Sequence, residues 1–205
     1  GEEILKPLNS TPGFEGVGTV KALGNNVSFL KAGDKVLLPM GTGSMRQELR
    51  INALELTKVK QPYTDDQQLA LITVNGFTAY FLLKDFVKLK QGDWLIQNAA
   101  NSNVGRYLIA LSKLHSIKTV NIVRREAIIP ELKALGATEI IIDKEHRKKE
   151  VLSRILKKNI KLGIDAVAGD ATENIAKSIA NKGLVVNYGT VTKKPCHISF
   201  WTLFK

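Results

Sequence analysis

The chain has 205 residues, of which 44% are hydrophobic and 24% charged, and this composition excludes an intrinsically disordered protein. No apolar run approaches the length of a membrane span, and Gly1-Glu2-Glu3 does not resemble the start of a signal peptide. Cys196 is the only cysteine, so no internal disulfide can form, which favours a reducing compartment.

The formal net charge of +11 requires a nucleic-acid function to be weighed. Basic residues are spread along the whole chain and cluster only within residues 147–161, where apolar residues recur at helical spacing. This pattern favours the solvated face of an amphipathic helix over a nucleic-acid patch. The same charge is compatible with an acidic substrate, such as a coenzyme A or acyl-carrier thioester.

Residues 1–60 are predicted to form a β-rich domain. The first expected strand ends at Gly24-Asn25-Asn26, a typical turn sequence, and Pro39 marks the end or the edge position of another strand. The expected strands cover residues 16–23, 35–39, 47–51 and 54–59.

Residues 61–205 are predicted to form an α/β domain. A helix begins between Pro62 and Gln68, is interrupted at residues 75–80 and is followed by a second helix at residues 79–85. Strands and helices then alternate, which is typical of a doubly wound parallel sheet of the Rossmann type. The expected strands are 94–98, 119–123, 139–142, 166–168 and 184–188, and the expected helices are 103–115, 129–135, 147–158 and 171–179. Both ends of the chain fall inside these patterns, so we expect both domains to be incomplete.

The stretch from Asp93 to Glu126 combines a short apolar strand, a turn of small residues, an amphipathic helix and a second apolar strand. In such a unit the helix begins directly above the end of the first strand. Its free backbone N–H groups and its dipole favour an anion at that point. The sequence therefore predicts a site for a dinucleotide pyrophosphate.

Several segments together resemble the medium-chain dehydrogenases/reductases. In the first domain these are Gly13-Phe14-Glu15-Gly16-Val17-Gly18-Thr19-Val20 and Lys31-Ala32-Gly33-Asp34-Lys35-Val36. In the second they are Asn75-Gly76-Phe77-Thr78-Ala79-Tyr80, Gln91-Gly92-Asp93 and the turn at residues 101–105. Within that superfamily, residues 43–48, 97–105, 121–125 and 186–189 are most similar to the mitochondrial-type trans-2-enoyl thioester reductases.

This resemblance implies an α/β fold with two parts. Residues 1–60 would belong to a GroES-like partial barrel, and residues 61–205 to a Rossmann-type domain that binds NADPH. No metal site is predicted, because Phe14 stands where zinc alcohol dehydrogenases carry a histidine ligand, and the single cysteine and three histidines lack ligand spacing. Without a Lewis acid, hydride transfer needs an acceptor that is already polarised, such as an enoyl thioester or a quinone.

The turn before the predicted helix departs from the usual glycine-rich fingerprint, since Asn101 and Asn103 occupy positions where glycine is common. Asparagine adopts left-handed backbone more readily than most residues, so the turn remains compatible with a dinucleotide. The residues assigned to the cofactor here are Asn101, Ser102, Asn103 and Val104. The alternative is a connecting turn that binds no ligand.

Arg124 and Arg125 follow the second strand at the distance where NAD enzymes carry an acidic residue for the ribose 2′-hydroxyl. Guanidinium groups suit a 2′-phosphate, which they bind bidentately, so the sequence predicts NADPH as the cofactor. Glu126 is the residue that argues against this assignment. The alternative role for the two arginines is that of solvated turn charges.

Two further cofactor contacts are implied by the resemblance. Asn75 stands where enoyl reductases of this family place an asparagine near the nicotinamide, and it could also cap the following helix. Tyr188, Gly189, Thr190 and Val191 follow the last expected strand, and their backbone would lie along the nicotinamide side. A simple strand-end turn is the alternative for that segment.

The catalytic residue is unknown. The resemblance implies a tyrosine in the N-terminal domain that protonates the substrate or polarises its carbonyl. Tyr63, Tyr80, Tyr107 and Tyr188 do not match that motif, so its counterpart is expected at or before Gly1. Arg46 lies in a segment typical of the branch and is assigned no role.

Three hypotheses follow for the function. The first is NADPH-dependent reduction of the C2=C3 double bond of a trans-2-enoyl thioester, carried by coenzyme A or acyl carrier protein, as a step of fatty acid biosynthesis. The second is a zinc-free NADPH:quinone oxidoreductase. The third, from another class, is an NADPH-responsive RNA-binding protein. The first implies a small-molecule acyl thioester partner, no membrane, a homodimer, and a place in the cytoplasm or the mitochondrial matrix.

Overall fold

The computed structural model describes residues 11–60, 65–146 and 148–204. The chain divides into two compact units, and the boundary between them lies at Phe77 and Thr78. Among the described residues, no helix combines the length and the hydrophobicity needed to cross a bilayer.

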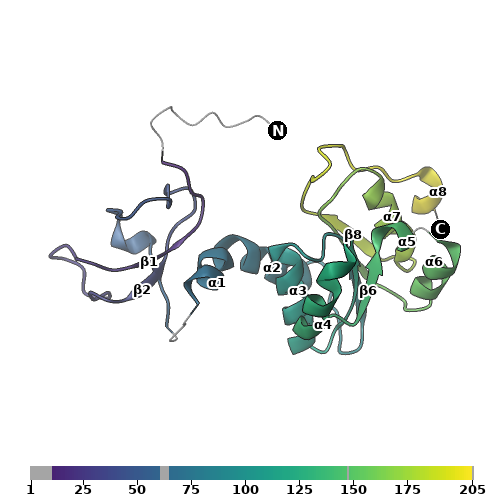
Figure 1. Cartoon of the computed structure of the whole chain (residues 1–205), viewed down its shortest axis with the longest axis horizontal. Coiled ribbons are helices and arrows are strands. Elements are labelled where there is room, and N and C mark those ends of the chain that lie inside the picture. The colour runs from purple at the N-terminus through teal and green to yellow at the C-terminus, as the bar shows by residue number, and fades with distance from the viewer. Residues whose placement is uncertain (1–10, 61–64, 147, 205) are drawn as a thin grey trace. The chain divides into compact units, whose positions relative to one another are not determined.

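The first unit contains a three-stranded antiparallel sheet in the order β1-β2-β3 (Figure 1). Its strands are β1 (Val17–Thr19), β2 (Lys35–Leu37) and β3 (Thr57–Lys58), and a short 3-10 helix, η1 (Ala53–Glu55), precedes β3. Val36 in the central strand and Leu30 beside it are buried. The sequence prediction was right about β2 and overlong for β1.

The strand predicted at residues 47–51 was wrong, because the described chain there is irregular and pairs with no strand. The segment predicted at 54–59 is half correct, since it begins in η1 and only Thr57–Lys58 pairs with β2. In both places most side chains are exposed. Without a buried face, alternating composition is insufficient to fix a strand.

A continuous helical segment follows, made of α1 (Asp66–Leu71), the π-helical turn η2 (Ile72–Gly76) and α2 (Phe77–Lys84). Asp65 caps it, since its carboxylate accepts from the N–H groups of Gln67 at 2.9 Å and Gln68 at 3.1 Å. The predicted interruption at residues 75–80 was therefore wrong. The chain passes residues 72–76 by widening one turn, and such π-bulges are frequent at functional sites.

The second unit is built on a five-stranded parallel sheet in the order β6-β5-β4-β7-β8, which confirms the predicted doubly wound α/β fold. The strands are β4 (Trp94–Gln97), β5 (Lys118–Val123), β6 (Glu139–Ile142), β7 (Leu162–Asp165) and β8 (Leu184–Asn187). All but β7 were predicted to within one residue.

The strand predicted at residues 166–168 was wrong, because β7 occupies the preceding four residues. Ala168 has a φ of 64°, in the left-handed region that no strand can contain. The Asp165 carboxylate also captures the N–H groups of Val167 at 2.9 Å and Ala168 at 3.2 Å, which turns the chain away from the sheet. Gly163 and Asp165 make β7 difficult to recognise from the sequence, since both residue types are depleted in strands.

Helices cover both faces of this sheet (Figure 1). On one face, α3 (Asn103–Leu114) and α4 (Ile129–Leu135, after the 3-10 turn η3, Glu126–Ile128) pack over Leu95 and Val123. On the other, α6 (Lys149–Leu156, after α5, Asp143–His146) and α7 (Asp170–Ser178) pack over Ile96 and Val120. Neighbouring residues of one strand thus serve opposite layers.

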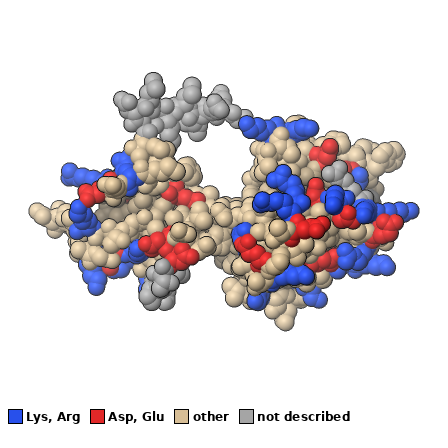
Figure 2. All heavy atoms as spheres, viewed as in Figure 1, with Lys and Arg blue, Asp and Glu red and all other residues tan. Residues whose placement is uncertain are grey.

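The basic cluster around α6 is largely ion-paired. Arg154 and Lys158 both contact Glu139, at 2.9 and 3.0 Å, and Lys161 contacts Asp93 at 2.9 Å. Ile155, on the same helix, is fully buried. Figure 2 shows basic and acidic side chains interspersed on this side of the second unit rather than separated into a single-sign field.

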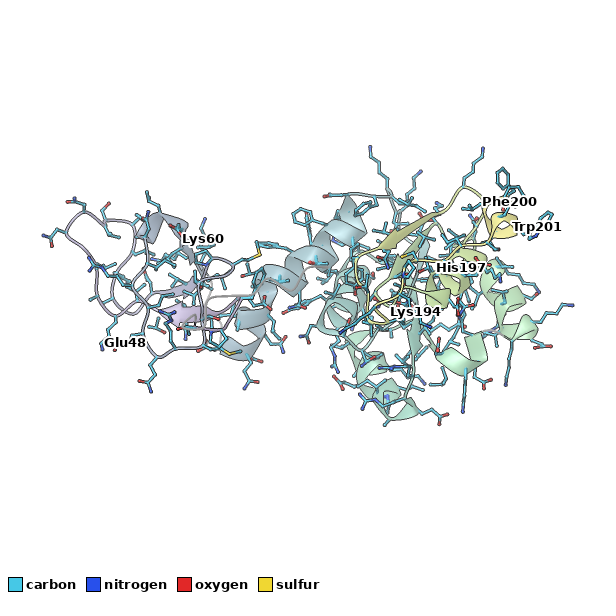
Figure 3. All side chains as sticks on the ribbon, turned by 90° about the horizontal axis from the view of Figure 1, so that it is seen from above. Glu48, Lys60, Lys194, His197, Phe200 and Trp201 are labelled. Atoms are coloured by element: carbon cyan, nitrogen blue, oxygen red, sulfur yellow. The ribbon has the colours of Figure 1, made fainter. Side chains whose placement is uncertain are left out.

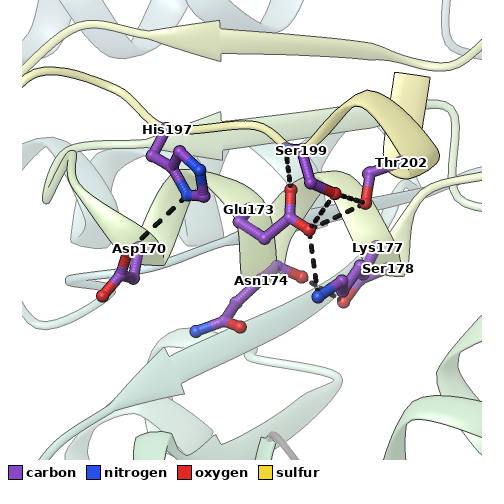
Figure 4. A network of polar contacts seen from close by, with 8 residues as sticks. All are labelled: Asp170, Glu173, Asn174, Lys177, Ser178, His197, Ser199 and Thr202. Carbon is purple, nitrogen blue, oxygen red and sulfur yellow. Dashed lines mark hydrogen bonds and ion pairs between the residues drawn. The ribbon is translucent and has the colours of Figure 1, made fainter.

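The last helix, α8 (Phe200–Leu203), is held by one carboxylate of α7 (Figure 4). Glu173 accepts from the Ser199 N–H at 2.9 Å, from the Ser199 hydroxyl at 2.8 Å and from the Thr202 hydroxyl at 2.8 Å. Lys177 pairs with it at 3.0 Å. Phe200 and Trp201 project outward from this helix, as Figure 3 shows, and Trp201 is 81% exposed.

Candidate site at the carboxyl edge of the parallel sheet

The strand order of the second unit defines where a ligand can enter. The chain runs from β4 outward through β5 to β6, and then returns to the other side of β4 as β7. In open parallel sheets, ligands bind outside the carboxyl ends of the strands at such a switch point. Four segments meet at this edge: residues 98–102 after β4, 124–125 after β5, 166–169 after β7 and 188–191 after β8.

The turn after β4 leads directly into α3. Ser102 caps the helix, because its hydroxyl accepts from the Gly105 N–H at 3.1 Å. The N–H groups of Asn103 and Val104 have no hydrogen-bond partner among the described residues. They are therefore available to an anion at the helix N-terminus.

Asn101 and Asn103 do not adopt the left-handed backbone that asparagine tolerates. Ala99, with a φ of 45°, takes the left-handed position in this turn, and Asn103 is already helical. Gly105 supplies the close approach, since a Cβ at that position would lie 2.6 Å from the Ala100 carbonyl oxygen. The turn therefore brings the start of α3 close to Ala100 with a single glycine, where the usual motif has three.

Gln97 joins this turn to the neighbouring strand. Its buried amide donates to the Gly105 carbonyl at 3.0 Å and to Asn121 Oδ1 at 2.8 Å. Asn121 in turn donates to the Thr119 hydroxyl at 2.8 Å. These bonds hold the start of α3 against β4 and β5, and the position of the anion site depends on this contact.

Arg124 and Arg125 extend into solvent from the end of β5, directly after Val123, which is buried. Within the described part of the chain, neither guanidinium has an ion-pair partner. Glu126 begins η3 and is also exposed. The two guanidinium groups therefore remain free to bind a phosphate at the same edge as the N-terminus of α3.

The segment after β8 is tied to the turn after β7. The Val191 N–H donates to the Ala166 carbonyl at 3.2 Å, and the Thr192 N–H donates to the Val167 carbonyl at 3.0 Å. Gly189 crosses Ala166 so closely that a Cβ would lie 2.8 Å from its carbonyl oxygen. The exposed side chains of Thr190 and Val191 follow this crossing.

Tyr188 links the end of β7 to the turn that precedes α3. Its N–H donates to the Asp165 carbonyl at 2.9 Å, and its hydroxyl is hydrogen-bonded to the Ser102 side chain. Burial raises the pKa of the Tyr188 phenol, the Ser102 hydrogen bond opposes this rise and the negative charge of Asp165 adds to it. The phenol is therefore a neutral link between β8 and the cap of α3.

Asp165 is the residue at this edge that the sequence prediction missed. It is fully buried at the end of β7, and its carboxylate accepts hydrogen bonds from side chains and N–H groups of several segments. Burial alone would raise the pKa of this carboxyl, but the hydrogen bonds outweigh it, so the pKa is lowered. The prediction missed Asp165 because it placed the strand after this residue, whereas Asp165 ends the strand.

Asn75 belongs to the first unit, in the π-helical turn η2. Its amide donates to Glu15 Oε1 at 3.0 Å and to the Leu71 carbonyl at 3.3 Å, while Glu15 Oε2 accepts from the Val74 N–H at 3.0 Å. The alternative role as a helix cap was wrong, because the helix is continuous through Asn75 and its side chain donates to it. Asn75 Oδ1 remains as the acceptor that a ligand could use.

Among the described residues, the others considered for catalysis or metal binding form no further site. Tyr63 lies outside the described residues. Arg46 donates to the Gly43 carbonyl at 2.8 Å and so stabilises its own loop. Cys196 is exposed, and the described residues contain no cluster of three or more metal-binding side chains.

Comparison with known proteins shows which families this chain resembles. Residues 2–82 match the family described as alcohol dehydrogenase GroES-like domain. The chain is 37% identical over 199 residues to the mitochondrial enoyl-[acyl-carrier-protein] reductase of Dictyostelium discoideum, a match that covers 93% of this chain and 56% of that protein. It is 34% identical over 200 residues to the Homo sapiens protein of the same name, covering 94% and 53%. The chain thus spans just over half the length of these curated relatives.

Solved structures agree with this. The complex of Etr1p with NADP and crotonyl-CoA superposes with a TM-score of 0.86 at 31% identity, covering 92% of this chain and 58% of that one. The heterodimer of the mitochondrial 2-enoyl thioester reductases Etr1p and Etr2p from Candida tropicalis gives 0.86 at 32%, with the same coverage. A quinone oxidoreductase of Pseudomonas syringae pv. tomato gives 0.74 at 27%, covering 96% and 61%. The chain is therefore related to the medium-chain dehydrogenases/reductases, and within them to the mitochondrial enoyl-[acyl-carrier-protein] reductases.

Proposed function

We propose that the protein reduces the C2=C3 double bond of a trans-2-enoyl thioester with NADPH. The observation that carries the proposal is the juxtaposition at the sheet edge: free N–H groups at the start of α3 and two unpaired arginines at the end of β5. An acyl thioester fits because the similar Etr1p structure holds NADP and crotonyl-CoA.

The residues of the edge fit the dinucleotide. The N–H groups of Asn103 and Val104, with the backbone of Asn101 and Ser102, would hold the pyrophosphate through the helix terminus. Arg124 and Arg125 would bind the 2′-phosphate, which explains why no acid occupies that strand tip. The backbone of residues 188–191 would line the nicotinamide side.

Asn75 would contribute its Oδ1 atom to the nicotinamide end. Glu15 and the Leu71 carbonyl already accept from the Asn75 amide nitrogen, so only the oxygen is left to a ligand. A carboxamide N–H is a donor that this oxygen can accept.

When bound, NADPH supplies the hydride that the β-carbon of the thioester receives. A proton must then reach the α-carbon, and we assign that step to no residue of this chain. What the described residues contribute is binding and orientation, which lower the barrier by holding the two reactants in one geometry.

The second candidate function is quinone reduction with the same cofactor site, favoured by the similarity to the quinone oxidoreductase structure. Turnover of crotonyl-CoA and of a small quinone, each with NADPH, separates the two. We expect the thioester to have the higher kcat/KM, and a preference for the quinone would contradict the proposed reaction.

RNA binding is the alternative from another class, and the net charge of +11 is its support. It predicts affinity that falls steeply as salt rises. Binding of RNA with such a slope, together with no thioester turnover, would replace the enzyme proposal.

We further propose that the protein acts as a homodimer on an acyl thioester carried by coenzyme A or acyl carrier protein, within fatty acid biosynthesis. The names of the curated relatives contain the word mitochondrial, which supports a mitochondrial location over the cytoplasm. The heterodimer of two related reductases supports dimerisation through this type of fold. Light scattering of the purified protein tests the oligomeric state.

A further inference from the structure

Asp165 combines complete burial with five hydrogen bonds. Its Oδ1 accepts from the Asn98 amide at 2.6 Å and from the N–H groups of Val167 at 2.9 Å and Ala168 at 3.2 Å. Its Oδ2 accepts from the Thr172 hydroxyl at 2.6 Å and the Asn187 amide at 3.0 Å. Asp165 has 0% exposure, so bulk solvent does not reach this arrangement.

No cation among the described residues pairs with this carboxylate. Burying an unpaired charge is costly unless hydrogen bonds replace the lost hydration. Here every bond is a donation to the carboxylate, and an ionised carboxylate accepts at both oxygens. A neutral amide at this position would set its own N–H groups against these donors. The site is therefore matched to a charged acceptor.

Four of the five donors lie at the strand ends and turns of the carboxyl edge, and the fifth, Thr172, lies in the first turn of α7. Asn98 follows β4 and precedes the turn to α3, and its Oδ1 also accepts from the Ala166 N–H at 2.8 Å. Val167 and Ala168 form the turn after β7. Asn187 ends β8 and also donates to the Gly189 carbonyl at 2.9 Å. One buried group thus holds the ends of three neighbouring strands together.

Two features show how much the geometry depends on this group. Ala168 and Gly169 both have left-handed backbone, with φ values of 64° and 62°, and a non-glycine residue in that region is strained. The Ala168 N–H is held by Asp165 itself. The strained turn in turn places the Ala166 and Val167 carbonyls, which accept from residues 191 and 192.

We propose that Asp165 is a positioning residue for the dinucleotide: its carboxylate holds the turns after β4, β7 and β8 in the arrangement that receives the pyrophosphate and nicotinamide portions. This inference rests on the proposed NADPH site. It also makes a distinction within that site. Arg124 and Arg125 follow β5, which gives no donor to Asp165, so the 2′-phosphate end should be independent of it.

The test compares two ligands in the full chain. In Asp165→Asn, the shape is retained and the charged acceptor is lost. We expect the dissociation constant of NADPH to rise by about 10-fold or more, the equivalent of about 1.4 kcal/mol. Binding of 2′,5′-ADP, which carries only the adenosine and 2′-phosphate portions, should change by less than about 3-fold, because distant contacts act additively.

Ser178→Ala is the matched control. Ser178 is fully buried like Asp165, and it lies at the C-terminal end of α7, away from the end that carries Thr172. Its side chain contacts His146 Nε2 at 2.8 Å and donates to the Asn174 carbonyl at 2.8 Å. It should lower the melting temperature and leave NADPH binding unchanged. If the loss of NADPH affinity followed the loss of stability in both variants, Asp165 would be merely structural and the proposal would be overturned.

Further outcomes decide the remaining cases. An Asp165→Asn protein that is folded and binds NADPH within 2-fold of the original, a change of about 0.4 kcal/mol, overturns the proposal. If that variant does not fold, Thr172→Val removes only one donor; about a 3-fold weaker NADPH affinity with unchanged 2′,5′-ADP affinity supports the proposal, and unchanged NADPH affinity overturns it. An unmodified chain that binds NADPH but reduces no thioester contradicts the proposed reaction alone, whereas one that binds no NADPH removes both.

Discussion

At the scale of single residues, Arg124 and Arg125 carry the choice between the two nicotinamide cofactors. Both are exposed and unpaired in the described part of the chain, so binding a phosphate would not require an existing ion pair to break. We predict that Arg124→Ala combined with Arg125→Ala weakens NADPH binding by about 100-fold or more, because each of the two charged hydrogen bonds that are lost contributes about 1.5–3 kcal/mol. NADH should bind as before.

The control for this measurement removes the same charge elsewhere. Lys149→Ala with Lys157→Ala also lowers the net charge by two, from two exposed positions at α6. Dissociation constants for both cofactors follow from NADPH and NADH fluorescence. Equal weakening of NADPH and NADH by the arginine double variant would refute the 2′-phosphate assignment.

Gly105 is the second residue whose replacement has a clear physical consequence. A Cβ at this position would lie 2.6 Å from the Ala100 carbonyl oxygen and 2.8 Å from its carbonyl carbon, and backbone atoms cannot rotate away. We predict that Gly105→Ala destabilises the fold by about 1–3 kcal/mol and shifts the start of α3 away from the turn. NADPH should bind more weakly as a result.

Gly24→Ala provides the comparison, since a Cβ there meets no atom within 4 Å. Urea unfolding with and without NADPH measures both effects. A Gly105→Ala protein as stable as Gly24→Ala would mean that the turn relaxes freely, and that the close packing of α3 on Ala100 is not required.

At the scale of an element, α8 depends on the Glu173 carboxylate, which caps it and contacts Lys177 (Figure 4). Burial would raise the pKa of Glu173, but the hydrogen bonds from Ser199, Thr202 and Lys177 outweigh it and lower the pKa to about 2. Because the folded-state pKa is below the ordinary value of 4.5, the carboxylate stabilises the fold fully above pH 4.5. That stabilisation is lost as the pH falls from 4.5 towards 2.

We therefore predict that Glu173→Gln lowers the free energy of unfolding near neutral pH by about 1–3 kcal/mol. The difference from the unmodified protein should shrink as the pH falls below 4.5, which pH-dependent thermal unfolding will measure. Asp170→Asn is the control on the same helix, since its contact with His197, at 3.7 Å, is largely exposed. A stability difference that stays constant down to pH 2 would contradict this role for Glu173.

At the scale of the whole molecule, the division at Phe77 and Thr78 separates a small antiparallel sheet from a parallel sheet with three buried clusters. The sheet-edge residues proposed for the cofactor all lie in the second unit, and only Asn75 belongs to the first. We predict two calorimetric unfolding transitions, of which the larger belongs to the second unit.

NADPH should raise the midpoint temperature of the larger transition by more than that of the smaller one, because a ligand stabilises only the unit that binds it. At 100 times the dissociation constant, that stabilisation is about 2.7 kcal/mol. NADH at the same concentration is the control and should shift it less. A single transition, or equal shifts of both, would contradict the expected independence of the two units.

The sequence alone was sufficient where a pattern is local. The alternation of apolar strands and helices predicted four strands of the parallel sheet, because strands buried on both faces are recognisable as short apolar runs. The position of Arg124 and Arg125 after β5 followed from the same pattern of strands. The resemblance to the enoyl reductase family was also present in short segments, and the comparisons confirm it.

Only the tertiary structure decided what depends on contacts between distant segments. β7 was displaced in the prediction because its turn is set by Asp165, whose partners lie up to 67 positions away in the sequence. Ala99 takes the left-handed position and Gly105 the close approach in the turn before α3, since packing against Ala100 and β5 determines the backbone there. Local composition specifies which segments become strands and helices, whereas the joints between them are fixed by hydrogen bonds that no local pattern contains.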